Sequence, residues 1–212
     1  YRHVYADKAQ GGVLYKHLRC QKKRRKRYAG GRDRRGQIIG RRPISERPNH
    51  VEKRRKIGHW EGDTLIGKGH KQAIVSLVER KSGYAVLAKV KNKTADLVSN
   101  AIIDRLKPLM RKVSTLTYDN GKEFADHASI DHALGSISYF ADPYSSWQRG
   151  SNENLNGLIR QYIPKSRPLS TVSDAELAKI EGLLNNRPRK RLGYKTPHEV
   201  FTKSFNPVAL RA

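Results

Sequence analysis

Three apolar runs that follow one another closely restrict the fold of this chain more than any other feature. They cover residues 64–66, 73–78 and 84–90, and the turns between them are too short to hold a helix. Short apolar runs bounded by glycine-containing turns are typical of β-strands. We therefore expect three strands joined by hairpins, which is an antiparallel meander.

The next part of the chain switches between helical and strand patterns. Apolar residues recur with the helical period from Val98 to Leu109, behind a Thr94 that can cap a helix. A strand that ends at Asp119, a helix through 124–134 and a strand at 137–140 are expected after it. The order predicts a mixed α/β domain with five strands.

Two more helices are predicted towards the C-terminus. The first opens near Ser151, a plausible N-cap, and its apolar stripe consists of Leu155, Leu158, Ile159 and Tyr162. The second opens at Ser173, which forms a capping-box pattern with Glu176.

Three carboxylates lie where the predicted structure changes. Asp63 leads into the first strand, Asp119 ends the fourth and is followed by Asn-Gly, and Glu153 lies opposite the apolar stripe of its helix. Ligands bind at the carboxyl ends of strands in open α/β sheets, which makes Asp119 a candidate. An acid in any one of these settings is more often a turn residue or a solvated side chain. The combination of the three carries the prediction.

The segments around these acids resemble a known family. They are residues 58–63 (GHWEGD), 116–124 (LTYDNGKEF) and 139–154 (YFADPYSSWQRGSNEN), and they are similar to the catalytic core of bacterial transposases of the insertion-sequence-thirty family. Residues 184–188 and 192–199 resemble the end of the same core. That family belongs to the DDE transposases and retroviral-type integrases.

The resemblance implies a ribonuclease-H-like fold and a set of catalytic acids. In that fold the first strand lies beside the fourth, which would bring Asp63 next to Asp119. The motif positions make Asp63 the first acid, Asp119 the second and Glu153 the third. Asp119 and Glu153 are 34 residues apart, close to the spacing of the last two acids in the family.

Acids gathered in this way would require a counter-charge. Like charges a few ångströms apart disfavour joint ionisation, and hard oxygen ligands suit Mg²⁺ or Mn²⁺ better than zinc. We expect two such ions, held by Asp63, Asp119 and Glu153, in a two-metal site for an in-line displacement. The resemblance implies that water attacks first and that the released 3′-hydroxyl then attacks target DNA, with no covalent protein–DNA intermediate.

Positive charge is the second signal of a nucleic-acid partner. The chain of 212 residues has a net charge of +25, and residues 1–56 hold 20 of its 44 Lys and Arg but only 4 of its 19 Asp and Glu. Such a dense run favours a flexible arm that binds phosphates, although a merely solubilising tail is an alternative. The expected partition is a basic arm over 1–50, a catalytic core over 51–205 and a tail over 206–212.

Several residues are candidates for DNA contact. Trp147 and Gln148 precede the Glu153 helix, where they can press on a DNA strand, while a buried Trp147 that anchors its loop is an alternative. Arg149 and Arg160 resemble basic residues that flank the third acid in related transposases. Residues 187–191 either follow a DNA backbone or form a solvated turn. The arm contributes Lys22, Lys23, Arg24, Arg25, Lys26 and Arg27.

The remaining expectations concern partners and location. The sequence predicts a DDE transposase that binds transposon ends and target DNA as a homo-oligomer; a nuclease of the same fold and a non-catalytic nucleic-acid-binding protein are the alternatives. The chain begins at Tyr1 and has Met110 as its only methionine, so we expect it to lack the family's N-terminal helix-turn-helix region. A single cysteine, Cys20, and no run of ~20 apolar residues predict a bacterial cytoplasmic, nucleoid-associated protein without membrane contact.

Overall fold

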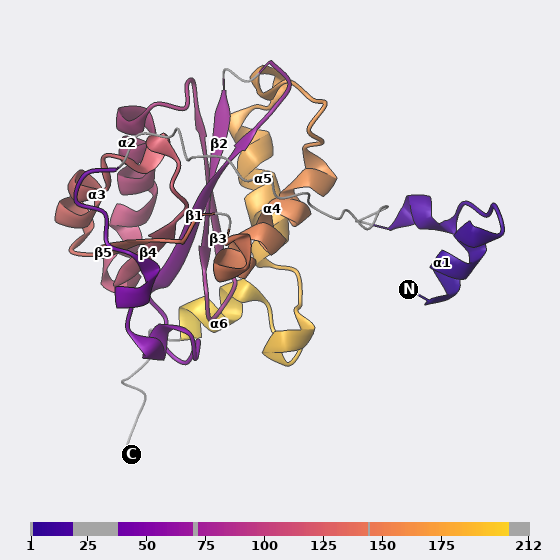
Figure 1. The fold of residues 1–212 in the computed structure, drawn as a ribbon, viewed down its shortest axis with the longest axis horizontal. Helices are drawn as coiled ribbons and strands as arrows, with labels where there is room; N and C mark the ends of the chain where they lie inside the picture. The colour runs from indigo at the N-terminus through magenta and orange to yellow at the C-terminus, as the bar shows by residue number, and fades with distance from the viewer. Residues whose placement is uncertain (1, 19–37, 70–71, 144, 204–212) are drawn as a thin grey trace. The chain divides into compact units, whose positions relative to one another are not determined.

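A computed structural model describes residues 2–18, 38–69, 72–143 and 145–203 (Figure 1). Its contacts divide the chain into two units, residues 1–36 and 37–212. The described part of the smaller unit contains α1 (Arg2–Ala9) and a 3-10 turn at Leu14–His17. No helix in the described ranges is long and apolar enough to cross a membrane.

The larger unit is built on a five-stranded mixed sheet. Its strands are β1 (His59–Ile66), β2 (Ala73–Glu79), β3 (Ala85–Val90), β4 (Thr115–Tyr118) and β5 (Ile137–Phe140), in the order β3-β2-β1-β4-β5. The first three strands are antiparallel, and β4 runs parallel to both β1 and β5. The predicted meander is therefore confirmed, and so is the position of the first strand beside the fourth.

Helices cover both faces of this sheet, as Figure 1 shows. On one face lie α2 (Ala95–Leu106) and α3 (His127–Leu134), and on the other lie α4 (Gly150–Tyr162) and α5 (Asp174–Asn185). A last short helix, α6 (Pro197–Lys203), packs Phe201 against the Trp60 ring. Two separate apolar cores result, one on each face of the sheet.

The side chains of β1 point alternately to the two faces of the sheet, and this alternation determines which of them face α4. Trp60 belongs to the core under α2 and α3, whereas Leu65 belongs to the core under α4 and α5. Successive side chains of a strand point to opposite faces, so Glu61 and Asp63 share the face of Leu65. This strand therefore presents two acids to the helix that carries Glu153.

Several element boundaries differ from the prediction. The helix expected over 124–134 begins at His127, after a separate 3-10 turn at Lys122–Phe124. β1 begins at His59 rather than Thr64, because its first residues pair with β2 and β4 and the buried Trp60 donates from Nε1 to the Lys112 carbonyl at 2.8 Å. Asp63 thus lies inside the strand and not before it. Ser151 is not an N-cap, since α4 begins one residue earlier, at Gly150. The Ser173 cap is confirmed, because its hydroxyl accepts a hydrogen bond from Glu176 N–H.

Residues 38–50, which the sequence assigns to the arm, belong to the unit of the sheet. The Arg42 carbonyl accepts a hydrogen bond from Phe140 N–H at the open edge of β5. Arg47 is buried and donates from Nη1 to the Thr117 hydroxyl of β4 at 2.8 Å. Backbone pairing at an exposed sheet edge is a usual way to cover it. The extent and the role of the arm stay predictions.

Candidate active site

Asp63 and Asp119 lie at the same level of two neighbouring strands. β1 and β4 pair in parallel with His59 opposite Thr115 and Glu61 opposite Thr117, and this register, carried two residues on, sets Asp63 opposite Asp119. Gly62 makes this arrangement possible, because a Cβ at that position would collide with the Tyr118 ring. The structure therefore brings together the first two predicted acids.

The guanidinium of Arg149 lies against both carboxylates. Its Nη1 is 3.4 Å from Asp63 Oδ2, and its Nη2 is 3.5 Å from Asp119 Oδ2. Nη1 also donates to the Gly62 carbonyl at 3.0 Å, and the side chain is only 10% exposed. Arg149 thus acts as an internal counter-cation for the two acids. Its predicted contact with DNA stays a prediction, and its side chain points inwards here.

The two acids differ in their surroundings. Burial raises the pKa of the Asp63 carboxyl above its ordinary value, and repulsion from Asp119 adds to this rise. The charge of Arg149 and a hydrogen bond from Thr64 N–H oppose it. The carboxyl of Asp119 is more exposed, at 40% against 23% for Asp63, and accepts a hydrogen bond from Gly121 N–H. This pair favours a cation beside it.

Glu153 lies on the side of α4 whose residues Asn156 and Arg160 contact β1. A helix turns by about 100° per residue, so Glu153 shares one side of α4 with Asn156 and Arg160. Asn156 donates from Nδ2 to Asp63 Oδ2 at 3.0 Å, and Arg160 donates from Nη2 to the Ile66 carbonyl at 2.8 Å. Glu153 itself is exposed. Glu153 therefore lies on the side of α4 from which two residues contact β1, and its approach to the acid pair stays a prediction.

The triad is not assembled as a closed metal site. Among the described residues, no group of three or more His, Cys, Asp and Glu is arranged to hold a metal ion. The ligand atoms nevertheless suit a divalent cation, because Asp63 and Asp119 offer carboxylate oxygens at the same level of the sheet. Both carboxylates also already lie against the positive charge of Arg149. Asp63, Asp119 and Glu153 would hold such an ion. Their catalytic roles remain predictions.

A buried acid that the sequence did not single out fixes the start of α4. Glu61 is fully buried and accepts a hydrogen bond from Asn152 N–H at 2.9 Å through Oε2. Its Oε1 lies 3.2 Å from Arg80 Nη1. A carboxylate is favourable at a helix N-terminus, where backbone N–H groups lack partners within the helix. Glu61 therefore ties the helix of Glu153 to the strand of Asp63.

Sequence reasoning also missed Asn156 and Ser76. Ser76 of β2 donates its hydroxyl to Asn156 Oδ1 at 2.7 Å, which orients the amide that contacts Asp63. The sequence did contain a signal for Glu61 and one for Asn156, because each shares a face with a predicted acid. Glu61 precedes Asp63 by two residues and so shares its strand face, and Asn156 follows Glu153 by three and so shares its helix face.

The other predicted DNA contacts have mixed surroundings. Trp147 is 68% exposed, so it does not anchor its loop by burial. Gln148 is engaged within the loop, where it accepts from Asp142 N–H and donates to the Asp142 carboxylate, both at 2.8 Å. Arg160 is half-buried against β1. The basic run at residues 22–27 lies outside the described residues.

Comparisons with known proteins identify relatives over nearly the whole chain. No family model matches it. It is 45% identical over 206 residues, 97% of its length, to the transposase for insertion sequence element IS4351 from Bacteroides fragilis, of which it covers 63%. It is 42% identical over 167 residues, 78% of its length, to the transposase InsI for insertion sequence element IS30A from Escherichia coli K12, of which it covers 43%. The chain thus spans less than two thirds of these relatives.

Solved structures agree with the fold. The catalytic core domain of BIV integrase matches with a TM-score of 0.52 and 25% identity, over 69% of this chain and 95% of that domain. A chain of the simian T-cell lymphotropic virus intasome, in complex with PP2A regulatory subunit B56 gamma, matches with a TM-score of 0.58 and 19% identity, over 74% of this chain and 58% of that one. The predicted ribonuclease-H-like fold is confirmed.

Proposed function

We propose that this chain, which belongs to the insertion-sequence-thirty family of bacterial transposases, contains the site that cuts and joins DNA strands. One observation carries the proposal: Asp63 and Asp119 lie at the same level of adjacent strands, beneath the helix that carries Glu153. The substrates would be the ends of an insertion sequence and a target duplex. Such a protein would act in the bacterial cytoplasm, on the DNA of the nucleoid.

Divalent cations would complete the site. We propose two Mg²⁺ or Mn²⁺ ions, held by Asp63, Asp119 and Glu153. When bound, such a pair supplies charge neutralisation for an in-line displacement, at both the attacking and the leaving oxygen. The shared contact of Arg149 with Asp63 and Asp119 supports a cation at this point, because the fold already places a positive group there.

The protein's own residues would orient the acids and hold the DNA. Asn156 fixes the Asp63 carboxylate through the hydrogen bond from Nδ2, and Glu61 keeps the start of α4 on β1. Water would attack the scissile phosphodiester and release a 3′-hydroxyl, and that hydroxyl would attack a phosphodiester of the target. Each step exchanges one P–O bond for another, so no covalent link to the protein is needed. We further propose that a homo-oligomer holds the two element ends.

A strand cleavage and joining assay tests this function. The purified chain is incubated with labelled duplexes that already carry a 3′-hydroxyl end, so that joining does not depend on recognition of an uncut end. We expect Mg²⁺-dependent joining to a second duplex, and none with EDTA. Cutting without joining would indicate a nuclease of the same fold. Binding without either reaction would indicate a non-catalytic nucleic-acid-binding protein.

Deletion of the basic arm should weaken the salt dependence of DNA binding. Each phosphate contact steepens the fall of log K with log salt by roughly 0.9 on duplex DNA, so removal of residues 1–36 should flatten the slope by several units. This deletion ends where the two units divide, and it leaves the sheet unit whole. Anisotropy titrations at several salt concentrations measure the slope. An unchanged slope would exclude the arm as a phosphate-binding element.

A further inference from the structure

A cavity of about 440 Å³ lies beside the start of α4 and is lined by three arginines, Arg54, Arg189 and Arg191. Ser151 and Gly150 of α4 form part of its wall. The Ser151 hydroxyl is buried and has no hydrogen-bond partner in the described part of the chain. A Cβ built on Gly150 would meet no atom within 4 Å. The cavity therefore combines positive charge with an unused donor.

Within the described ranges, none of these arginines forms an ion pair. No carboxylate among the described residues lies within ion-pair distance of Arg54, Arg189 or Arg191. Arg189 and Arg191 each donate instead to a backbone carbonyl, of Leu184 at 3.0 Å and of Lys81 at 2.9 Å. Burial lowers the pKa of both guanidinium groups. Repulsion from Arg187 and Arg191 lowers the pKa of Arg189 further, and repulsion from Arg54 lowers that of Arg191, against an opposing attraction from Glu79. Repulsion of this kind is relieved when an anion binds between the cations.

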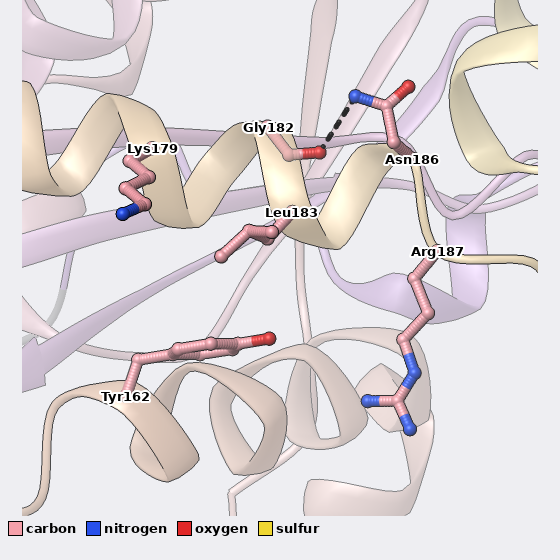
Figure 2. A pocket seen from close by; sticks show the side chains of 6 residues that line it. All are labelled: Tyr162, Lys179, Gly182, Leu183, Asn186 and Arg187. Atoms are coloured by element: carbon pink, nitrogen blue, oxygen red, sulfur yellow. Dashed lines mark hydrogen bonds between the residues drawn. The ribbon is translucent and has the colours of Figure 1, made fainter.

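A second cavity, of about 530 Å³, lies between α4 and α5. Figure 2 shows Lys179 and Leu183 of α5 facing Tyr162 of α4, with Arg187 extending from the segment after α5. Arg189 interacts electrostatically with Arg187, Arg191 and Tyr162. It therefore links the linings of the two cavities. We call this row the flank groove; it consists of Arg54, Arg191, Arg189, Arg187 and Lys179.

The flank groove and the acid pair lie on opposite sides of α4. The residues of this helix that line the two cavities include Ser151, Leu158 and Tyr162, and at about 100° per residue they form one stripe. Glu153 and Arg160 form the opposite stripe. A ligand in the flank groove would consequently not compete with a strand at the acids.

We propose that the flank groove binds backbone phosphates of a DNA segment away from the scissile position. This inference rests on the proposed function, because a protein that cuts DNA must hold the duplex beyond the reacting phosphate. Arginine presents forked donors that match phosphate oxygens, and the Ser151 hydroxyl, which has no partner in the described part of the chain, lies in the same cavity wall. Contacts of this kind position the duplex and carry no base specificity.

The test compares variants of the flank groove with a control of equal charge. The first variant is Arg189→Gln with Arg191→Gln. The second is Lys179→Gln with Arg187→Gln, two side chains that form no hydrogen bond with the described part of the chain. The control is Lys107→Gln with Arg111→Gln, two exposed positions on the 3-10 turn at Lys107–Lys112, which follows α2 on the other face of the sheet. Affinity for a random duplex is measured by anisotropy without divalent cations, at several salt concentrations, and folding is checked by thermal unfolding.

We expect each groove variant to make the fall of log K with log salt shallower by about 2, which is roughly 0.9 per lost phosphate contact. The control should change this slope by much less. Equal slopes for control and folded groove variants would overturn the inference. So would inorganic phosphate or an acidic peptide that binds the wild type but not the groove variants, while the DNA slopes stay equal. If the wild type binds DNA in this way but neither cuts nor joins it, the proposed function fails and the groove stands.

Discussion

Asp119→Asn is expected to reduce strand cleavage by about a thousandfold or more while DNA affinity stays equal or rises. The carboxylate is needed to hold a cation, whereas its negative charge repels the phosphates of the substrate. Asp63→Asn and Glu153→Gln should have the same effect. When catalytic residues act as one unit, removal of any one of them costs the enzyme most of its activity. Cleavage is measured on labelled duplex, and affinity by anisotropy.

A matched control separates this effect from a general change of charge. Asp104 is an exposed acid on α2, on the other face of the sheet, and Asp104→Asn removes the same charge. Its cleavage rate should stay at the wild-type value. Wild-type cleavage by Asp119→Asn would show that the triad is wrong, and a parallel loss of DNA affinity would assign Asp119 to substrate binding.

Glu61→Ala is expected to lower the free energy of unfolding by about 3–5 kcal/mol. Removing one partner of a buried ion pair leaves the other charge uncompensated, and Glu61 and Arg80 are both buried. The N–H of Asn152 loses its acceptor as well. Because this acceptor fixes the start of α4, hydrogen exchange should rise in the first turn of that helix before the rest of the domain opens.

Urea unfolding of the wild type and three variants checks this prediction. Glu46→Ala, at an exposed acid, should unfold like the wild type. Glu61→Gln keeps an oxygen that can accept from Asn152 N–H but loses the charge opposite Arg80, so its stability should lie between the wild type and Glu61→Ala. Equal unfolding midpoints for Glu61→Ala and Glu46→Ala would mean that the buried pair does not hold α4.

The antiparallel meander of β1, β2 and β3 was predictable from the sequence because its signals are local, whereas the position of β1 beside β4 came from the family resemblance. β2 and β3 are short apolar runs, and the turn at residues 81–83 allows only a hairpin between them. The strand that ends at Asp119 is terminated by Asn-Gly, which is a strong turn signal. The side of α4 that carries Glu153 followed from helical period alone. Each of these features needs only neighbours in sequence.

The features that the sequence did not reveal depend on distant partners. Glu61 and Arg149 are charged and would be expected at the surface, yet each is buried beside a partner more than 15 residues away. Residues 38–50 have the basic composition of a flexible arm, but Arg47 donates a hydrogen bond to the Thr117 hydroxyl on β4. Local composition predicts solvation for such residues, and only the tertiary fold supplies their counter-charges.

Diffraction from crystals soaked in Mn²⁺, with anomalous scattering used to locate the ion, tests the proposed catalytic centre most directly. We expect anomalous signal beside the carboxylates of Asp63 and Asp119, with Glu153 turned towards it and the Arg149 guanidinium moved away from at least one of its two acids. Crystals of Asp119→Asn should show weaker signal or none. Mn²⁺ bound only elsewhere, with Arg149 still held between Asp63 and Asp119, would contradict the assignment of these three acids as the metal site.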